Sequence, residues 1–400
     1  MLENQTAAVH GRMTITGLIE SILAQVDIPL TLQEIEGDAV FPYAARAGRR
    51  HKPYNSTPEG KPMKAWQIRG EYGIDKLRRV DVPEPTAGAG EVVVSLRAAS
   101  LNFRDLATIR GFPGAQAPPA LIPCSDGAGV VQSVGAGVRG LNVGDRVAPT
   151  FFQSWIDGPV TAEARSLALG GSLNGVLAER IALSADGVVK IPDAMTFDEA
   201  ATLPCAGLTA WRAIAVEAPV GAGDTVLVQG TGGVSIFALQ FAKARGARVI
   251  VTSSSDAKLE RARSLGADQG INYATTPNWS AEVRRLTDNR GVDVVVEVGG
   301  ENTLTQAMQC TRVGGSIVVI GVLSGFGSAI SLPMLFSNNL RLIGISVGSR
   351  AHFVDMLSHI EQWQLKPVID RTFGFEQVPE ALMTMQSGKF FGKLCIRIGN

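Results

Sequence analysis

The chain has 400 residues, more than one hydrophobic core usually organises, so two domains with some additional chain are expected. Lysine plus arginine and aspartate plus glutamate both number 37, which argues against a nucleic-acid partner and against an anionic membrane surface. The longest apolar runs, VDVVVEV and SIVVIGV, are as long as strands and far shorter than the roughly 20 residues that span a bilayer. A small molecule is therefore the expected partner.

The first residues, MLENQTAAVHGRM, lack the charged start and apolar block of a secretion signal, so a cytoplasmic protein is expected. Residues 1–62 combine an amphipathic helical pattern over 14–24, a strand-like stretch and a basic, proline-rich segment. We interpret them as a short N-terminal extension and linker without a catalytic role. The four cysteines form no C-x-x-C pair, which favours reduced thiols: Cys124, Cys205, Cys310 and Cys395.

Residues 63–205 carry short strand-like runs separated by glycine and proline turns, a pattern that predicts an irregular antiparallel barrel. In residues 206–348, β-branched runs such as TVLVQ, RVIVT and VDVVVEV alternate with helical patterns. This alternation predicts a doubly wound parallel sheet with helices on both faces. Residues 349–400, with a helical pattern at FVDMLSHIEQW and the ending GKLCIRIGN, are expected to return to the first domain.

The stretch DTVLVQGTGGVS places glycines directly after a strand and before a helix. Such a turn lets the backbone approach a phosphate, whose charge the helix N-terminus favours, so it predicts a dinucleotide site. A purely structural tight turn is the alternative. The residues expected at the coenzyme here are Gly230, Gly232, Gly233 and Val234.

The end of the next strand bears on which dinucleotide is bound. A carboxylate about 20 residues beyond the turn would hold the ribose diol, but this chain has hydroxyls at Ser253 and Ser254 and an amine at Lys258. These groups suit a 2′-phosphate, so NADPH is favoured over NADH. Asp256 is the competing feature, and we assign it to the first turn of the following helix. A serine-rich loop with a solvated lysine is the alternative.

Several motifs together resemble the medium-chain dehydrogenase/reductase superfamily: AASLNFRDL, IPCSDGAGVVQSVGAGVRGLNVGDRV, AATLPCAGLTAWRAI, VLVQGTGGVS and GKLCIRI. The resemblance covers residues 63–400. It implies an α/β protein with a GroES-like irregular β-barrel catalytic domain, completed by 349–400, and a Rossmann domain. It also implies an NAD(P)H-dependent oxidoreductase.

Zinc-dependent members of that superfamily bind catalytic zinc through Cys, His and Cys. Carried over by position, the first cysteine falls on Asn102, the histidine on Ser125, and only the third ligand is kept, as Cys205. One thiolate cannot hold zinc, so no zinc is expected, although a site built from Cys124, Asp126 and Cys205 is an alternative. In lacking these ligands, the chain resembles the zinc-independent branch of the superfamily, which includes quinone and enone reductases. Within it, the motifs are most similar to a bacterial subgroup labelled NAD(P)-dependent alcohol dehydrogenase.

The resemblance implies hydride transfer from NADPH to a quinone or an α,β-unsaturated carbonyl. Asn102 would donate its amide to the coenzyme ribose or the substrate oxygen, and Thr209 would lie beside the nicotinamide. Asp105 and Asp126 remain open between a substrate-site role and hydrogen bonding to the barrel. The other coenzyme contacts that the resemblance implies are Tyr273, Val298, Gly299, Ile320, Val322 and Lys393.

Around the expected cleft, aromatic residues could stack on a flat acceptor or pack in the core: Phe103, Phe151, Phe152 and Trp155. The loop at 151–175, which contains three of them, is long and glycine-rich, which is typical of a lid. The stretch NLRLIGISVG would be an apolar sheet edge, so a homodimer through this strand is expected. Two other functions stay open, a zinc alcohol dehydrogenase and an NADPH-binding sensor without turnover.

Overall fold

The computed structural model describes residues 61–111, 115–325, 327 and 330–399. All of them belong to the compact unit Arg49–Asn400. The helix expected at 14–24 and the strand-like segment after it lie outside the described residues. Within the described ranges, no helix combines the length and the apolar character that crossing a bilayer requires.

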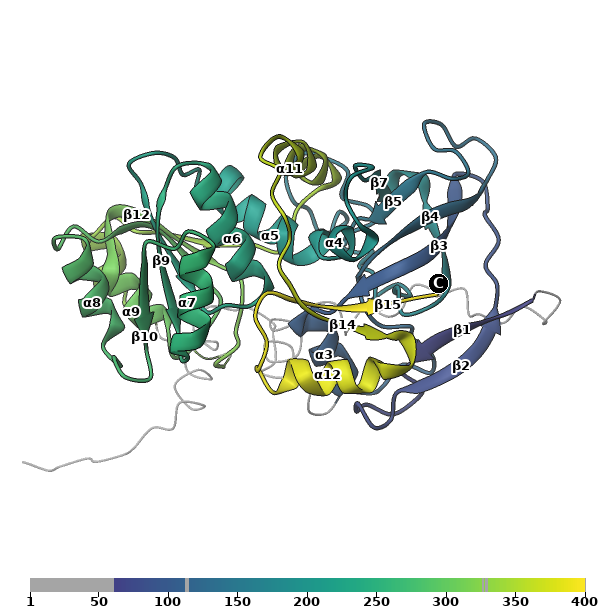
Figure 1. Ribbon diagram of the computed structural model, residues 1–400, viewed down its shortest axis with the longest axis horizontal. Helices are drawn as coiled ribbons and strands as arrows, with labels where there is room; N and C mark the ends of the chain where they lie inside the picture. The colour runs from purple at the N-terminus through teal and green to yellow at the C-terminus, as the bar shows by residue number, and fades with distance from the viewer. Residues whose placement is uncertain (1–60, 112–114, 326, 328–329, 400) are drawn as a thin grey trace, which may run out of the picture. The chain divides into compact units, whose positions relative to one another are not determined.

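The sheet of the Rossmann domain lies among helices α6 to α9 (Figure 1). It has six parallel strands in the spatial order β10-β9-β8-β11-β12-β13. Strands β8 and β11 are buried at every residue, as expected for a parallel sheet covered on both faces. The predicted doubly wound domain is confirmed. Its strands are β8 (Thr225–Gln229), β9 (Arg248–Ser253), β10 (Gln269–Asn272), β11 (Val292–Glu297), β12 (Thr311–Val319) and β13 (Arg341–Gly344).

Helices connect these strands and cover the sheet: α6 (Gly233–Ala244), α7 (Asp256–Ser264), α8 (Trp279–Leu286), α9 (Leu304–Cys310) and α10 (Leu332–Ser337). Helix α6 starts at the glycine turn, and the chain leaves it through Gly246, whose φ of 85° favours glycine. The edge strand β13 is shorter than the expected NLRLIGISVG. It ends at Gly344 because the chain then turns toward the barrel, with Val347 in the left-handed region at a φ of 49°.

The barrel domain contains a seven-stranded sheet in the order β14-β15-β3-β4-β5-β7, with β6 paired to β3. Strand β15 pairs antiparallel with β3, so the end of the chain lies beside the central strand of this sheet (Figure 1). The strands are β3 (Glu91–Ser100), β4 (Asp126–Val134), β5 (Arg146–Pro149), β6 (Arg180–Ser184), β7 (Val188–Lys190), β14 (Ile369–Gly374) and β15 (Lys393–Arg397). The separate antiparallel pair is β1 (Pro62–Gln67) and β2 (Arg78–Pro83).

The remaining helices lie at the barrel and at its junction with the Rossmann domain. Within the junction, η2 and η3 have the hydrogen bonding of π-helices, a rare form found often at functional sites. Trp211 is buried between Phe241 of α6 and His359 of α11. The segments are α3 (Phe103–Arg110), η1 (Ala185–Gly187), α4 (Phe197–Ala201), η2 (Leu203–Gly207), α5 (Leu208–Trp211), η3 (Arg212–Glu217), α11 (Arg350–Gln362), η4 (Phe375–Gln377) and α12 (Val378–Gln386).

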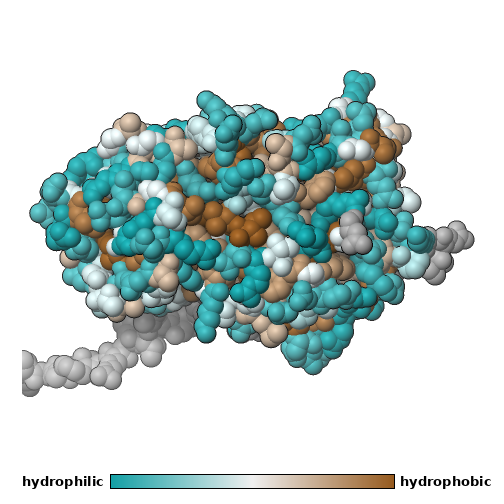
Figure 2. Space-filling view, viewed as in Figure 1, coloured by the Kyte–Doolittle hydropathy of each residue, from teal (hydrophilic) through white to brown (hydrophobic). Residues whose placement is uncertain are grey.

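The apolar side chains form separate cores in the two domains. The barrel core gathers residues of β1, β3, β4 and α12, and a second cluster packs between the Rossmann strands and α8 and α9. On the face seen in Figure 2, most residues are hydrophilic and the hydrophobic ones form small groups between them. These two cores hold the glycine turn and the end of β15 in the positions described next.

Candidate active site

The glycine turn joins β8 to α6 and offers backbone N–H groups to an anion. Gly230 has a φ of 72°, which favours glycine. Gly232 is the N-cap of α6, and because glycine has no side chain it leaves the first N–H groups of the helix without a side-chain cap. A Cβ atom on Gly232 would meet no atom within 4 Å, so the space in front of it is open. This cradle fits a dinucleotide phosphate, with Gly233 and Val234 in the first turn of the helix.

The end of the chain lies against this turn. Gly392 forms an isolated bridge with Gly232, and its N–H donates to Thr231 O at 2.9 Å. A Cβ atom on Gly233 would lie 2.6 Å from Lys393 Cδ, so only glycine leaves room for the lysine stem. The backbone at Gly392 and the stem of Lys393 therefore lie beside the turn that is expected to hold the coenzyme.

The ammonium group of Lys393, however, points into the barrel. Its Nζ donates to Leu101 O and to Asn102 Oδ1, both at 2.6 Å, and the residue is only 3% exposed. The lysine thus connects the coenzyme turn with the barrel position where the zinc-dependent members of the superfamily carry a metal ligand.

Asn102 stands at the N-terminus of α3 and is 8% exposed. Its side-chain Nδ2 is buried and has no hydrogen-bond partner among the residues that the structure describes. Asp105 accepts the Asn102 backbone N–H at 2.8 Å and pairs with Arg104. Burial raises the pKa of Asp105, and the Arg104 charge opposes that rise. Asp105 therefore holds the start of α3 and does not face an open cleft.

Asp126 lies behind Asn102 and is fully buried. Its Oδ1 accepts from Ser125 Oγ at 2.6 Å and its Oδ2 from the Cys205 backbone N–H at 2.9 Å. Burial raises the pKa of Asp126 to about 6, with the Lys393 charge opposing and Asp105 adding to the rise. Asp126, the first residue of β4, thereby holds the start of η2 in place through the Cys205 backbone.

The donor set at this position does not fit zinc. Burial raises the pKa values of the Cys124 and Cys205 thiols, and the other two positions carried over from the zinc ligands hold an amide and a hydroxyl, Asn102 and Ser125, in place of the thiolate and imidazole that zinc prefers. The Lys393 ammonium lies 2.6 Å from Asn102 Oδ1 and would repel a metal cation there. Among the residues that the structure describes, no three or more His, Cys, Asp or Glu side chains form a group that could hold a metal.

Cys124 adopts a strained backbone conformation in this cluster. Its φ of 74° lies in the left-handed region, which is unusual for a residue with a Cβ atom. The residue is fully buried, and its Sγ donates to Ser100 O at 3.4 Å. Gly175 packs so closely that an added Cβ would lie 1.9 Å from Cys124 O. The loop after β5 is thus part of what holds this conformation.

The residues expected at the adenosine end lie at the ends of β9 and β10. Ser253 is buried, and its Oγ accepts from Ser255 N, whereas Ser254 is exposed. The Lys258 Nζ donates to Gly388 O at 2.6 Å, so this cation contacts the C-terminal segment. Burial lowers the pKa of Lys258. Tyr273, just after β10, is 44% exposed.

At the carboxyl end of β11, next to β8, a hydrogen-bond network that sequence reasoning missed holds the turn after β11 in place. Glu297 is fully buried, and its Oε1 accepts from Gly299 N, Gly300 N and Thr303 Oγ1 at 2.6 to 2.9 Å. The sequence feature that could have pointed to this network is Glu297, a carboxylate within the otherwise apolar end of the run VDVVVEVGG.

The structure brings the remaining expected coenzyme contacts to this edge of the sheet. Val298 and Gly299 follow β11, and Ile320, just after β12, donates its N–H to Glu297 O. A Cβ atom on Gly300 would lie 3.0 Å from Val322 Cα, so the two turns are in contact. Thr209 is buried in α5, between the two π-helical segments.

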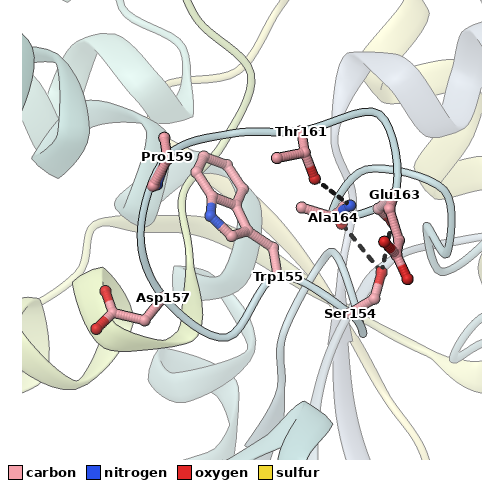
Figure 3. A pocket seen from close by; sticks show the side chains of 7 residues that line it. All are labelled: Ser154, Trp155, Asp157, Pro159, Thr161, Glu163 and Ala164. Atoms are coloured by element: carbon pink, nitrogen blue, oxygen red, sulfur yellow. Dashed lines mark hydrogen bonds between the residues drawn. The ribbon is translucent and has the colours of Figure 1, made fainter.

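Of the aromatic residues considered for stacking on an acceptor, only Phe103 is exposed. Phe151, Phe152 and Trp155 are at most 6% exposed and contact one another, so they pack in the core. The loop after them holds a hollow of about 330 Å³ that lies within the loop itself (Figure 3). None of its lining residues belongs to the glycine turn or to the Asn102 cluster: Ser154, Trp155, Asp157, Pro159, Thr161, Glu163 and Ala164.

Known proteins share this arrangement along most of the chain. The model of the alcohol dehydrogenase GroES-like domain matches residues 88–193, and that of the zinc-binding dehydrogenase matches residues 233–362. A zinc-type alcohol dehydrogenase-like protein of Schizosaccharomyces pombe is 42% identical over 334 residues, 82% of this chain and 96% of that protein.

Two further proteins extend the comparison. The 2-methylene-furan-3-one reductase of Solanum lycopersicum is 32% identical over 340 residues, which are 84% of this chain and 79% of the reductase. A crystal structure described as an alcohol dehydrogenase from Sinorhizobium meliloti superposes with a TM-score of 0.78 at 41% identity. That match covers 84% of this chain and 99% of the other.

Proposed function

The chain belongs to the medium-chain dehydrogenase/reductase superfamily and is an NAD(P)H-dependent oxidoreductase, and on that premise we propose that it reduces conjugated carbonyl compounds with NADPH. The proposed acceptors are quinones and α,β-unsaturated ketones or aldehydes. The observation that carries the proposal is the donor set around Asn102, which offers a buried amide N–H and a lysine but does not suit zinc.

The coenzyme would be held by the glycine turn and by the ends of the neighbouring strands. The free N–H groups at the start of α6 suit its pyrophosphate, and the turn fixed by Glu297 would lie along the nicotinamide. Ser254 and Lys258 offer a hydroxyl and a cation to a 2′-phosphate, and this favours NADPH over NADH. When bound, the coenzyme supplies a hydride.

A conjugated acceptor suits a site that lacks a metal cation. Hydride arrival at its β-carbon moves an electron pair onto the carbonyl oxygen, where hydrogen bonds stabilise the charge, and water then supplies a proton to the α-carbon. An unactivated alcohol would need a Lewis acid to stabilise its alkoxide. The Asn102 Nδ2 is the donor that would give a hydrogen bond to such an oxygen. A relative that is named as the reductase of a methylene-furanone, a conjugated ketone, supports this class.

The test is NADPH oxidation against a panel of quinones, alkenals, enones, enoyl thioesters and saturated aldehydes, with protein whose metal content is measured before and after chelation. We expect turnover with conjugated acceptors that survives chelation. Activity restricted to saturated aldehydes or alcohols and lost together with stoichiometric zinc would establish a zinc alcohol dehydrogenase instead, the class that the names of several relatives suggest. Coenzyme binding without turnover of any compound would favour a sensor.

We also propose a cytoplasmic homodimer joined through the edge of the Rossmann sheet. Among the described strands, β13 is the last one on its side of the sheet, and large apolar side chains of β12 and of the chain between β12 and β13 are 45% to 70% exposed. A second copy would cover this edge and these side chains, which are Val313, Leu323, Ile330, Leu332 and Phe336. Light scattering at micromolar concentration tests this, and a monomer would contradict it.

A further inference from the structure

Lys393 contacts both halves of the site, through its stem at the glycine turn and through its ammonium at Asn102. We propose that Lys393 is a positioning residue that holds the Asn102 amide with its N–H groups turned toward the acceptor substrate. The inference rests on the proposed reduction of a conjugated acceptor and assigns the residue that prepares Asn102 for it.

The chemistry of the two side chains fixes the orientation of the amide. An ammonium group has three donors and no acceptor, so only the oxygen of the Asn102 amide can face it. The 2.6 Å contact between Lys393 Nζ and Asn102 Oδ1 therefore turns Nδ2 to the opposite side. There Nδ2 is buried and finds no partner in the described ranges of the chain, a costly arrangement unless a ligand completes it.

The competing acceptor for Nδ2 is the Asp126 carboxyl. Each of its oxygens already accepts a hydrogen bond, one from Ser125 and one from the Cys205 backbone. The Asn102 side chain lies near enough to lower the pKa of this carboxyl, but within the described part of the chain no hydrogen bond of ordinary length joins Nδ2 to it. A substrate oxygen would give Nδ2 a partner that the protein does not provide.

The lysine also strengthens the donor that it orients. A cation bound to an amide oxygen draws electron density from the amide, which makes its N–H groups better donors. Because the Lys393 residue is only 3% exposed, water screens this effect little. The Lys393 ammonium would thus help to stabilise negative charge on the substrate oxygen through the Asn102 amide. In the zinc-dependent members of the superfamily, the metal ion does this directly.

The alternative role for Lys393 is direct binding of the coenzyme phosphates. Its stem lies against Gly233, but its ammonium is taken by Leu101 O and Asn102 Oδ1, away from the turn. The two roles differ in what they affect. A phosphate ligand would set coenzyme affinity, whereas a residue that orients Asn102 would set the rate of reduction.

A double-mutant cycle with Lys393→Met and Asn102→Ala separates these roles. We expect each single variant to lose about 100-fold in kcat for a conjugated acceptor, and the double variant to lose no more than the worse single one. The dissociation constant of NADPH should stay within about 3-fold, as the lysine does not hold the phosphates. Lys190→Met, at an exposed ion pair of the barrel, is the matched control and should match wild type.

Two results would overturn the proposal. One is a double variant whose loss equals the product of the single losses, which would mean that the lysine does not act through Asn102. The other is weaker NADPH binding at an unchanged kcat. If Lys393→Met does not fold, Lys393→Leu takes its place, because its apolar side chain fills the position of the lysine stem and likewise donates no hydrogen bond to Asn102 Oδ1.

A second measurement does not depend on activity. In NMR spectra of protein with isotope-labelled asparagine side chains, Asn102→Ala identifies the Asn102 amide signal. We expect Lys393→Met to shift this signal and Lys190→Met to leave it in place. An unmoved signal would overturn the proposal even in an active enzyme. Wild-type protein that reduces no conjugated acceptor would instead overturn the proposed function, while the NMR result would still decide whether Lys393 orients Asn102.

Discussion

Gln229 and Glu297 end the neighbouring strands β8 and β11, and the Gln229 Nε2 donates to Glu297 Oε2 at 2.5 Å. The same carboxylate binds the backbone of the turn that follows β11. Gln229 is also the last residue before the glycine turn. One buried carboxylate thus ties together the two turns expected to line the coenzyme.

We expect Glu297→Gln to weaken both the fold and coenzyme binding. An amide in place of the carboxylate would put an NH₂ group against at least one of the present donors, and leave a buried group unpaired. The expected loss is about 1 to 3 kcal/mol in the free energy of unfolding. NADPH affinity should fall several-fold because the turn at Val298 and Gly299 is released. Urea unfolding and coenzyme fluorescence titration measure the two effects.

Glu301→Gln is the matched control, since Glu301 lies in the same turn region but is exposed. It should change the free energy of unfolding by less than about 0.5 kcal/mol. Equal losses in the two variants would show that the buried network has no special role.

We expect Ser254→Asp to shift coenzyme preference from NADPH toward NADH. Ser254 is exposed at the end of β9, where a carboxylate would repel a 2′-phosphate and could hold the ribose diol. The ratio of the two dissociation constants should move toward NADH by about 10- to 100-fold. Titration of each coenzyme against the variant measures this ratio.

Ser264→Asp adds the same charge at the far end of α7, on an exposed residue. It should leave the ratio within about 2-fold of wild type, because exposed charges beyond a Debye length are screened. A wild-type enzyme that prefers NADH, or a Ser254→Asp variant with an unchanged ratio, would contradict the assignment of the 2′-phosphate site.

Asp293 binds the groups around the start of β11, and its ionisation makes the free energy of unfolding depend on pH. It accepts from Thr225 N and pairs with Arg290 and Arg312, and these partners outweigh burial and lower its pKa from 3.8 to about 2. The ionised carboxylate therefore stabilises the fold above the unfolded-state pKa of 3.8, and this contribution is lost as pH falls toward 2.

We expect Asp293→Asn to lower the free energy of unfolding by about 1 to 2 kcal/mol at neutral pH. This is less than the lowered pKa of Asp293 would imply, because Arg290 is half exposed and water screens its charge. The difference from wild type should shrink as the pH falls below 3.8. Asp288→Asn, at an exposed position of the preceding turn, is the control and should change little. A difference that stays constant over this range would show that the ion pairs do not carry the effect.

The sequence allowed the parts of the site that depend on local pattern to be predicted. The alternation of strands and helices predicted the Rossmann domain, and glycines between TVLVQ and an apolar helical face predicted the turn before α6. These features follow from contacts between residues close in sequence, so a single sequence contains them. The assignments of individual coenzyme contacts stay predictions.

The polar cluster could not be derived in this way. Lys393 meets Asn102 across 291 positions, and Asp126 meets the Cys205 backbone across 79, and no local pattern encodes which side chains the barrel brings together. The same limit applies to the aromatic residues after β5, where composition alone left stacking and core packing open. Their burial follows from contacts with α11 and with the junction, as in the pair Trp155 and His352.

The titration of Asp126 should appear in the rate of reduction. Burial raises the pKa of this carboxyl to about 6, so it is protonated below that pH and ionised above it. In the proposed reaction, negative charge develops on the oxygen that Asn102 binds, and an ionised Asp126 behind Asn102 would repel that charge. We therefore expect kcat for a conjugated acceptor to fall by up to about 10-fold as pH rises through this pKa.

Asp126→Asn removes the titrating group and keeps an acceptor for the Cys205 backbone N–H. Its kcat should be flat across the same pH range and, at neutral pH, at least equal to that of wild type, because the repulsion is gone. If the variant shows the same pH dependence as wild type, another group titrates. If it loses activity at every pH, the carboxylate acts by holding η2 in place, and its charge does not control the rate.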